Sequence, residues 1–286
     1  MAGGLSRRVF LRSAATAVAS FGSIARATAA APASGRLKQS VCRWTLPGPL
    51  AEVCSRVRGL GLEAIDLLYP DEWGVARSSG LTCSMGYASR RAHFIEDGFN
   101  DPQLQPMLIE ELTAAIPRAA QARVPNLIAM FGNRRGRSDA DGIANCAAGL
   151  SKVAPVAEAN GVTVCVELLN SKVDHKDYQG DHTSFGAAVM ERVASPRVKL
   201  LYDIYHMQIM EGDVIRTIRD HRQWIGHFHT AGVPGRHEID DSQEINYHAV
   251  AMAIADTGFA GYLAHEFSAS GEPYAALAQA LRICRV

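Results

Sequence analysis

Residues 162–170 read VTVCVELLN, residues 198–206 read VKLLYDIYH, residues 224–230 read WIGHFHT and residues 261–267 read GYLAHEF. Each stretch is a short run of branched and aromatic residues, and each carries an acidic residue or a histidine near its end. Runs of this length and composition predict buried β-strands. Ionisable side chains are rarely buried without a partner. These four stretches therefore decide both the fold and the search for a site.

Four more runs of the same kind precede them, at residues 38–44, 63–68, 81–86 and 125–132. Between the runs, apolar residues recur with helical spacing, as Leu50, Val53 and Val57 do. The interval between residues 68 and 81 leaves room only for a short helix. Strands that alternate with helices predict a parallel sheet of βαβ units. Eight of them, closed by an apolar helix at residues 274–283, favour a single (β/α)8 TIM barrel over residues 36–286.

Composition agrees with a one-domain enzyme. The chain has 286 residues, 48% of them hydrophobic, and Lys plus Arg equal Asp plus Glu at 29 each. This balance leaves no overall field that would attract nucleic acid or an anionic membrane surface. No GxGxxG or P-loop motif follows the first predicted strand, which argues against a dinucleotide or nucleotide site. The six cysteines show no CxxC spacing and are expected to be free buried thiols, although a disulfide stays open.

The N-terminal segment differs from the rest of the chain. Arg7 and Arg8 precede an Ala-rich apolar stretch at residues 14–25, and small-residue triplets follow it. This order predicts a twin-arginine signal peptide and linker over residues 1–35, and therefore a periplasmic or otherwise exported protein. The alternative is an Ala-rich tail with a chance arginine pair. The stretch is shorter than the roughly 20 apolar residues that span a bilayer, so no membrane anchor is expected.

The four decisive stretches place Glu167, Asp203, His229 and Glu266 about one strand–helix unit apart. The barrel topology then predicts that they meet at one rim, where the active sites of this fold lie. Carboxylates brought together raise one another's pKa values, and a divalent cation removes that conflict. Three carboxylates and one imidazole suit Mn²⁺ first, with Mg²⁺, Co²⁺ or Zn²⁺ possible. A satisfied core polar group is the alternative for any one residue, but four in successive units favour a metal site.

Other polar residues follow the same strand ends. His206 stands three residues after Asp203, and Arg236 follows His229 on a polar stretch. A guanidinium in a metal-lined pocket suits the capture of a carboxylate or several hydroxyls. His206 is expected either to bind substrate or to orient a neighbouring ligand. Weaker candidates, for a loop that closes over substrate, are Lys172, His175 and His182.

Longer motifs surround these residues. They are ELLNSK at 167–172, DHT at 181–183, LLYDIYHMQ at 200–208, GHFHTAGVPGRHE at 226–238 and EINY at 244–247. This text resembles hydroxypyruvate isomerase and its relatives in the xylose isomerase-like barrel superfamily, which includes the ketose 3-epimerases. GLTCSMG at 80–86 and GNRRG at 132–136 extend the likeness over nearly the whole chain after the N-terminal segment. Position 229 carries His, as the epimerases do, where hydroxypyruvate isomerases typically carry Gln.

The resemblance implies a metal bound by Glu167, Asp203, His229 and Glu266, with the two glutamates also moving a proton. It implies that His206 and Arg236 hold substrate oxygens. The implied reaction is an isomerisation through an enediolate, with hydroxypyruvate converted to tartronate semialdehyde. A ketose 3-epimerase or sugar isomerase at the same site is the alternative. Rivals from other classes are a metal-dependent lyase or hydrolase acting on 3-keto sugars or glycosides, and a non-catalytic sugar-binding barrel. The sequence does not decide whether the chain forms a homo-oligomer.

Overall fold

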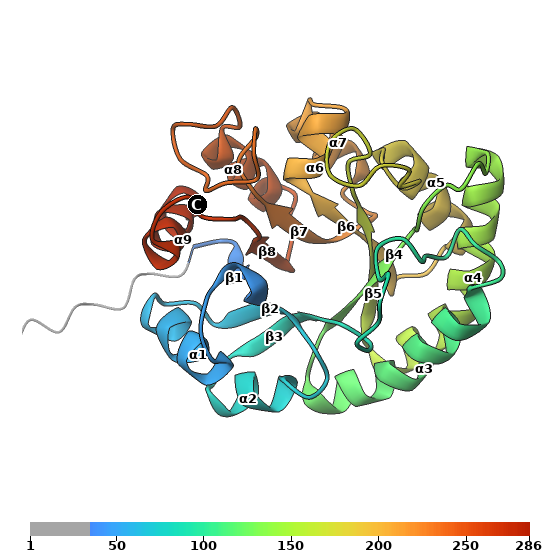
Figure 1. The fold of residues 1–286 in the computed structure, drawn as a ribbon, viewed down its shortest axis with the longest axis horizontal. Helices are drawn as coiled ribbons and strands as arrows, with labels where there is room; N and C mark the ends of the chain where they lie inside the picture. The colour runs from blue at the N-terminus through green and yellow to red at the C-terminus, as the bar shows by residue number, and fades with distance from the viewer. Residues whose placement is uncertain (1–34) are drawn as a thin grey trace, which may run out of the picture. The chain divides into compact units, whose positions relative to one another are not determined.

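A computed structural model describes residues 35–286, and strands and helices alternate through this part of the chain (Figure 1). The predicted export signal and nearly all of its linker, residues 1–34, lie outside the described residues. Among the helices that the structure does describe, none combines the length and the apolar character needed to cross a bilayer.

The strands make one parallel sheet that curves into a barrel. Its eight members are β1 (Lys38–Val41), β2 (Ala64–Leu68), β3 (Thr82–Gly86), β4 (Asn126–Met130), β5 (Thr163–Leu168), β6 (Val198–Asp203), β7 (Ile225–Thr230) and β8 (Tyr262–His265). Neighbours follow the order β1-β8-β7-β6-β5-β4-β3-β2. β1 and β2 stand at the two ends of this order. One parallel residue pair, Cys42 with Asp66, joins them and closes the barrel. The predicted barrel is confirmed, and each predicted run contains one strand.

Helices cover the outside of the barrel, as the ring of coiled ribbons in Figure 1 shows. They are α1 (Leu50–Gly59), α2 (Trp73–Ser78), α3 (Gln105–Ala122), α4 (Asp139–Asn160), α5 (Thr183–Val193), α6 (Ile204–Met210), α7 (Val214–His221), α8 (Tyr247–Asp256) and α9 (Pro273–Ile283), and a 3-10 turn spans Arg43–Thr45. α4 shows why they form where they do. Ser138 caps its first turn, and Gly161 ends it in the left-handed region at φ 67°.

The core lies on both faces of the strands. All five residues of β2 and of β4 and all six of β5 are buried, as expected for parallel strands packed between a barrel interior and a helical layer. All six cysteines are buried and free in the described part of the chain. Because the strands are parallel, the carboxyl ends of β5, β6, β7 and β8 meet at one rim.

Candidate metal centre

The four residues that sequence predicts as metal ligands come together at this rim. Glu167 lies in β5, Asp203 ends β6, His229 lies in β7 and Glu266 directly follows β8. Each offers one ligand atom, and these four atoms all lie within 4.8 Å of one another. All four side chains are buried, with at most 5% of any residue exposed. The topology therefore converts residues distant in sequence into one compact polar cluster.

His229 lies at the centre of this cluster. Its Nδ1 is 3.2 Å from Glu167 Oε1 and 3.1 Å from Glu266 Oε2. Asp203 is fixed by the helix that follows it, because its Oδ1 accepts the backbone N–H groups of Tyr205 at 2.8 Å and of His206 at 3.3 Å. This is the usual capping role of Asp at a helix N-terminus. It leaves the second carboxylate oxygen of Asp203 directed at the cluster.

Unsatisfied atoms show that the cluster fits a cation. Within the described residues, Glu167 Oε1, Asp203 Oδ2 and His229 Nδ1 are buried but make no hydrogen bond of acceptable geometry. Buried polar atoms without a partner are rare and costly. One divalent ion would satisfy all three, and a set of carboxylate oxygens with one imidazole nitrogen suits Mn²⁺, Mg²⁺ or Co²⁺.

The pKa values of the cluster follow from burial and from two cationic neighbours. Burial raises the pKa of Asp203 to about 8 and also raises the pKa of Glu167. Burial acts in the same direction on Glu266, but Arg236 and His229 outweigh it and hold the pKa of that carboxyl well below its usual range. Burial alone would lower the pKa of His229, yet the surrounding acidic groups raise it well above its usual value. The cluster thus has a strong affinity for positive charge.

Two residues fix the orientation of Glu266. Its Oε1 accepts the indole N–H of Trp44 at 3.0 Å, and its Oε2 accepts Arg236 Nη2 at 2.6 Å. Arg236 comes from the loop between β7 and α8, and the same Nη2 lies 4.0 Å from Asp203 Oδ2. The Arg236 Nε is buried and donates to no partner in the described structure. The guanidinium therefore contacts the cluster and keeps one N–H group free for a ligand.

The sequence predicts that His206 lies at the end of β6. In the structure it reaches the cluster from α6 instead. Because Asp203 caps α6, the chain passes from strand to helix three residues earlier than the apolar run indicates. Asn170 Nδ2 donates to His206 Nδ1 at 2.7 Å. His206 Nε2 lies 3.6 Å from Asp203 Oδ2 and has no hydrogen-bond partner. This nitrogen therefore lies beside the cluster with its hydrogen-bonding capacity unused.

Of the three weaker loop candidates, one lies near the cluster and two lie away from it. His175 lines the cavity above the cluster, and its ring centroid is 5.3 Å from that of His206. Lys172 instead donates to the carbonyls of Ile209 and Met210 at 2.9 and 2.8 Å. His182 pairs with Asp181 at 2.7 Å, and 47% of its side chain is exposed. Only His175 therefore faces the candidate site.

A cavity of about 200 Å³ opens over the cluster. Its charged and polar lining comes from Glu167, Glu266, Arg236 and His175. The rest of the lining is apolar or aromatic: Trp44, Leu67, Tyr87, Phe94, Ile95, Ile128, Met130 and Leu169. The volume lies below the range of about 300–1,000 Å³ that is typical of drug-sized ligands, so the cavity suits a small metabolite.

Sequence reasoning missed two residues near the centre. Asp66 lies within the apolar run of β2, fully buried, and its Oδ2 accepts His229 Nε2 at 2.9 Å. Burial would raise the pKa of Asp66, but His227 and His229 outweigh it and hold the pKa well below its usual range. A carboxylate inside an apolar strand was the available signal. Trp44 gave no such signal, because a tryptophan beside a strand more often packs in the core.

Comparisons with known proteins agree with this geometry. The family model described as xylose isomerase-like TIM barrel matches residues 74–285. A putative hydroxypyruvate isomerase from Drosophila melanogaster is 30% identical over 166 residues, or 58% of this chain and 62% of that protein. A 2-oxo-tetronate isomerase from Cupriavidus necator is 36% identical over 118 residues, or 41% of this chain and 45% of that protein.

The fold is also found among solved structures. A D-psicose 3-epimerase from Clostridium cellulolyticum H10, crystallised with D-tagatose, has a TM-score of 0.69 at 19% identity, over 87% of this chain and 100% of that one. The chain thus matches less than two thirds of the length of the two sequence relatives but the full length of this structure. Since the family match covers most of the described residues, the chain belongs to the xylose isomerase-like TIM barrel family.

Proposed function

We propose that this chain is a metal-dependent isomerase that moves a proton between adjacent carbons of a small hydroxy-carbonyl compound. The observation that carries the proposal is the convergence of three carboxylates and one imidazole, with unsatisfied buried atoms, at the floor of a small cavity. A purely structural cluster would have its polar atoms paired. Two sequence relatives are named as isomerases, which supports the same class of reaction.

The metal would be held by Glu167, Asp203, His229 and Glu266. A divalent ion bound there supplies a Lewis acid that stabilises negative charge on the oxygens of the reacting substrate. Mn²⁺ is our first choice for this donor set, with Mg²⁺ or Co²⁺ as alternatives. All other steps fall to side chains of the chain itself.

Glu167 and Glu266 are the residues placed to move the proton, because both carboxylates line the cavity. Trp44 and Arg236 hold Glu266 in one orientation. One carboxylate takes the proton from the carbon that bears the hydroxyl group. If the proton returns to the former carbonyl carbon, the carbonyl and hydroxyl groups exchange places.

Arg236 and His206 would hold the substrate. Arg236 Nε and His206 Nε2 are both buried and unpartnered in the described structure, so each can donate to a substrate oxygen. A guanidinium is also suited to a carboxylate. This pair therefore favours a substrate with several oxygens next to the reacting carbons.

Hydroxypyruvate is the first candidate substrate. The proton would leave C3 and return to C2, while the hydroxyl proton passes to the carbonyl oxygen, and the product is tartronate semialdehyde. No atoms are gained or lost. The names of the two sequence relatives, hydroxypyruvate isomerase and 2-oxo-tetronate isomerase, support a keto acid of this kind.

A ketose 3-epimerase is the second candidate, and the cavity lining favours it. Eight apolar or aromatic residues line the cavity, which is more apolar surface than a fully oxygenated three-carbon acid can use. The carbon-bound hydrogens of a longer sugar would fill that surface. Return of the proton to the same carbon from the opposite face, by the second glutamate, would then invert its configuration.

One experiment distinguishes an isomerase or epimerase from a lyase, a hydrolase or a binding protein. Metal-stripped protein is incubated in D₂O with Mn²⁺, Mg²⁺ or Co²⁺ and followed by NMR, with hydroxypyruvate, a 2-oxo-tetronate, free ketohexoses and a 3-keto-glycoside as substrates. The proposal predicts deuterium at the reacting carbon and an isomeric product only when metal is added. Cleavage of the 3-keto-glycoside would support a lyase or hydrolase instead. Tight sugar binding without any exchange would indicate a binding protein.

We also propose that the N-terminal segment directs export through the twin-arginine route, supported by the order of its arginines, apolar stretch and small-residue triplets. Such a route suits a protein that folds and acquires its metal before export. In cells, replacement of Arg7 and Arg8 by Lys should leave the protein in the cytoplasm, as measured by fractionation. Unchanged export of this variant would contradict the proposal.

A further inference from the structure

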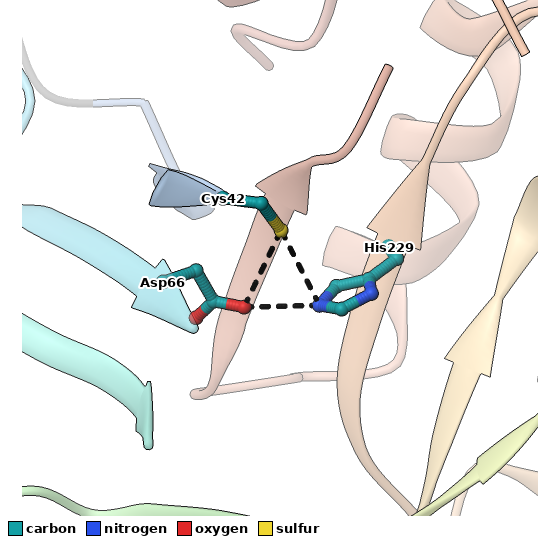
Figure 2. Close-up of side chains that lie close together, drawn as sticks. All are labelled: Cys42, Asp66 and His229. Carbon is teal, nitrogen blue, oxygen red and sulfur yellow. Dashed lines mark hydrogen bonds and ion pairs between the residues drawn. The ribbon is translucent and has the colours of Figure 1, made fainter. Parts of the chain in front are cut away.

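A second buried polar group lies directly behind the metal centre, around Asp66 of β2. Figure 2 shows Asp66, Cys42 and His229 directed at one another from three different strands or strand ends. Asp66 Oδ2 accepts His229 Nε2 at 2.9 Å, His227 Nε2 at 3.2 Å and the Cys42 thiol at 3.8 Å. The other oxygen, Oδ1, accepts the hydroxyl of Ser84. Four donors thus converge on one carboxylate that is 0% exposed.

An irregularity in β2 places two consecutive side chains, those of Asp66 and Leu67, inside the barrel. The register between β2 and β3 shifts on both sides of Asp66, and Leu67 has a φ of 56°. In a regular strand, neighbouring side chains point to opposite faces. Here Asp66 contacts the histidines of β7 while Leu67 lines the cavity, so both side chains face the barrel interior. A bulge with a leucine in the left-handed region costs conformational free energy. This cost indicates that the Asp66 side chain does more than fill space in the core.

The direction of each ring nitrogen of His229 determines what it can bind. Nδ1 faces Glu167 and Glu266 in the candidate metal centre, and Nε2 faces Asp66. A neutral imidazole has one N–H group and one lone pair, and an ionised carboxylate can only accept. A histidine that binds a metal through Nδ1 has given up the proton on that nitrogen, so in the metal-bound state the contact with Asp66 requires the remaining proton on Nε2 and leaves the lone pair on Nδ1.

We propose that Asp66 is a positioning residue, which holds the His229 ring and keeps its proton on Nε2 so that Nδ1 binds the metal. The inference rests on the proposed metal-dependent function. It assigns a role to a residue outside the four ligands. Carboxylates that orient a metal-binding histidine in this way tune the affinity of many metal sites.

Cys42, Asp66 and His229 are also close enough to hold an ion of their own. The hydrogen bonds argue against this. An ion between them would displace the proton on His229 Nε2, and with a second ion on Nδ1 the ring would have to lose both of its protons. The four donors already satisfy Asp66. Support of the metal centre therefore explains this group better than a second metal does.

The test is the affinity of metal-stripped protein for Mn²⁺, measured by electron paramagnetic resonance of the free ion. Asp66→Ala should weaken binding by about 10–100-fold, the usual effect of losing such a partner. Asp66→Asn should weaken it less, because the amide oxygen can still accept from His229. The matched control is Gln105→Ala, which removes two buried hydrogen bonds from α3, to the carbonyls of Phe99 and Asn145, and should leave the affinity unchanged.

A second readout reports on the histidine itself. In Zn²⁺-loaded protein with ¹⁵N-labelled histidine, NMR should show His229 with its proton on Nε2 in the wild type. In Asp66→Ala this signal should be lost or broadened while the backbone spectrum is retained. A variant that only loosened the fold would change the backbone spectrum as well.

The outcomes separate this inference from the function on which it rests. A wild-type chain that binds none of Mn²⁺, Mg²⁺ and Co²⁺ overturns both. A wild type that binds one ion, with Asp66→Ala binding it equally well, overturns the positioning role alone. Two ions in the wild type, one of them lost in Cys42→Ala, would show a second metal site and overturn the role as well.

Discussion

At the scale of single residues, the account depends most on Glu167 and Glu266. Each is proposed to bind the metal and to move a proton, so Glu167→Gln and Glu266→Gln should each lower kcat by at least about 10²-fold at saturating metal. Deuterium exchange from solvent into substrate measures this loss directly. Glu244→Gln is the control, because the Glu244 side chain is exposed and accepts a hydrogen bond from Gln208, away from the cluster, so this variant should retain full activity. Near-normal deuterium exchange in Glu167→Gln or in Glu266→Gln would show that the replaced glutamate does not move the proton.

Arg236 gives a prediction about pH. Its guanidinium is the main group that holds the pKa of Glu266 low, against the effect of burial. A carboxyl with a lowered pKa stays ionised, and so able to accept a proton, down to a lower pH. Arg236 also lowers the pKa values of Asp203 and Glu167, so without its charge the pKa values of all three carboxyls rise and the ionised cluster is lost at a higher pH. Arg236→Gln should therefore move the acid limb of the kcat/KM profile to higher pH.

Arg236→Lys serves as the comparison for this shift. It keeps the positive charge but loses the planar fork that contacts Glu266, so its acid limb should move less than that of Arg236→Gln. Identical acid limbs in the wild type and in Arg236→Gln would show that Arg236 does not control Glu266.

Residue patterns predicted the four residues that cluster at the rim but not the groups that orient them. An ionisable residue near the end of an apolar run is visible in the sequence. That pattern identified all four residues of the cluster, which are Glu167, Asp203, His229 and Glu266. Asp66 shows the same pattern at residues 63–68, yet its role depends on a bulge that no sequence pattern marks. Trp44 contacts Glu266 only because the chain leaves β1 in a 3-10 turn at Arg43–Thr45.

At the scale of elements, the loop that precedes α3 packs so closely against the end of β4 that one of its glycines has no free space beside it. At Gly98, which lies against the end of β4, an added Cβ would come within 2.1 Å of the backbone carbonyl carbon of Phe131. Gly98→Ala should therefore destabilise the fold by about 1–3 kcal/mol or more, as overpacking does. For a domain of this size each kcal/mol corresponds to roughly 2–4 °C in Tm, which calorimetry can resolve.

Gly74 in α2 is the matched control. An added Cβ there meets nothing within 4 Å. Gly74→Ala should leave the Tm unchanged or raise it, because alanine favours the helix by about 0.5–1 kcal/mol. If both variants unfolded at the same temperature, the close packing at Gly98 would be wrong.

Element types were more predictable than element ends. Alternating apolar runs and helical spacing located all eight strands, because parallel strands buried on both faces carry a continuous apolar signal. The short helix α2 followed from the length of its interval alone. The sequence placed the end of β6 at His206, three residues too late, because the apolar run continues to that residue. In the structure Asp203 caps the next helix, and this local capping ends the strand.

At the scale of the whole molecule, metal binding should stabilise the barrel. An ion that binds only the folded chain adds about 2.7 kcal/mol at a concentration of 100 times Kd, and its four ligands join β5, β6, β7 and the end of β8. Metal-stripped protein should therefore unfold roughly 5–10 °C below protein with added Mn²⁺. Calcium, a larger ion, is the control and should restore less stability. Equal melting temperatures with and without Mn²⁺ would indicate that no ion is held by the fold.

The central claim is that Glu167, Asp203, His229 and Glu266 together hold one divalent ion. The most direct measurement is anomalous X-ray diffraction from crystals of the protein grown with Mn²⁺. We expect one strong anomalous peak per chain, within bonding distance of an atom from each of these four side chains. No peak among them, or a peak coordinated by other residues, would contradict it.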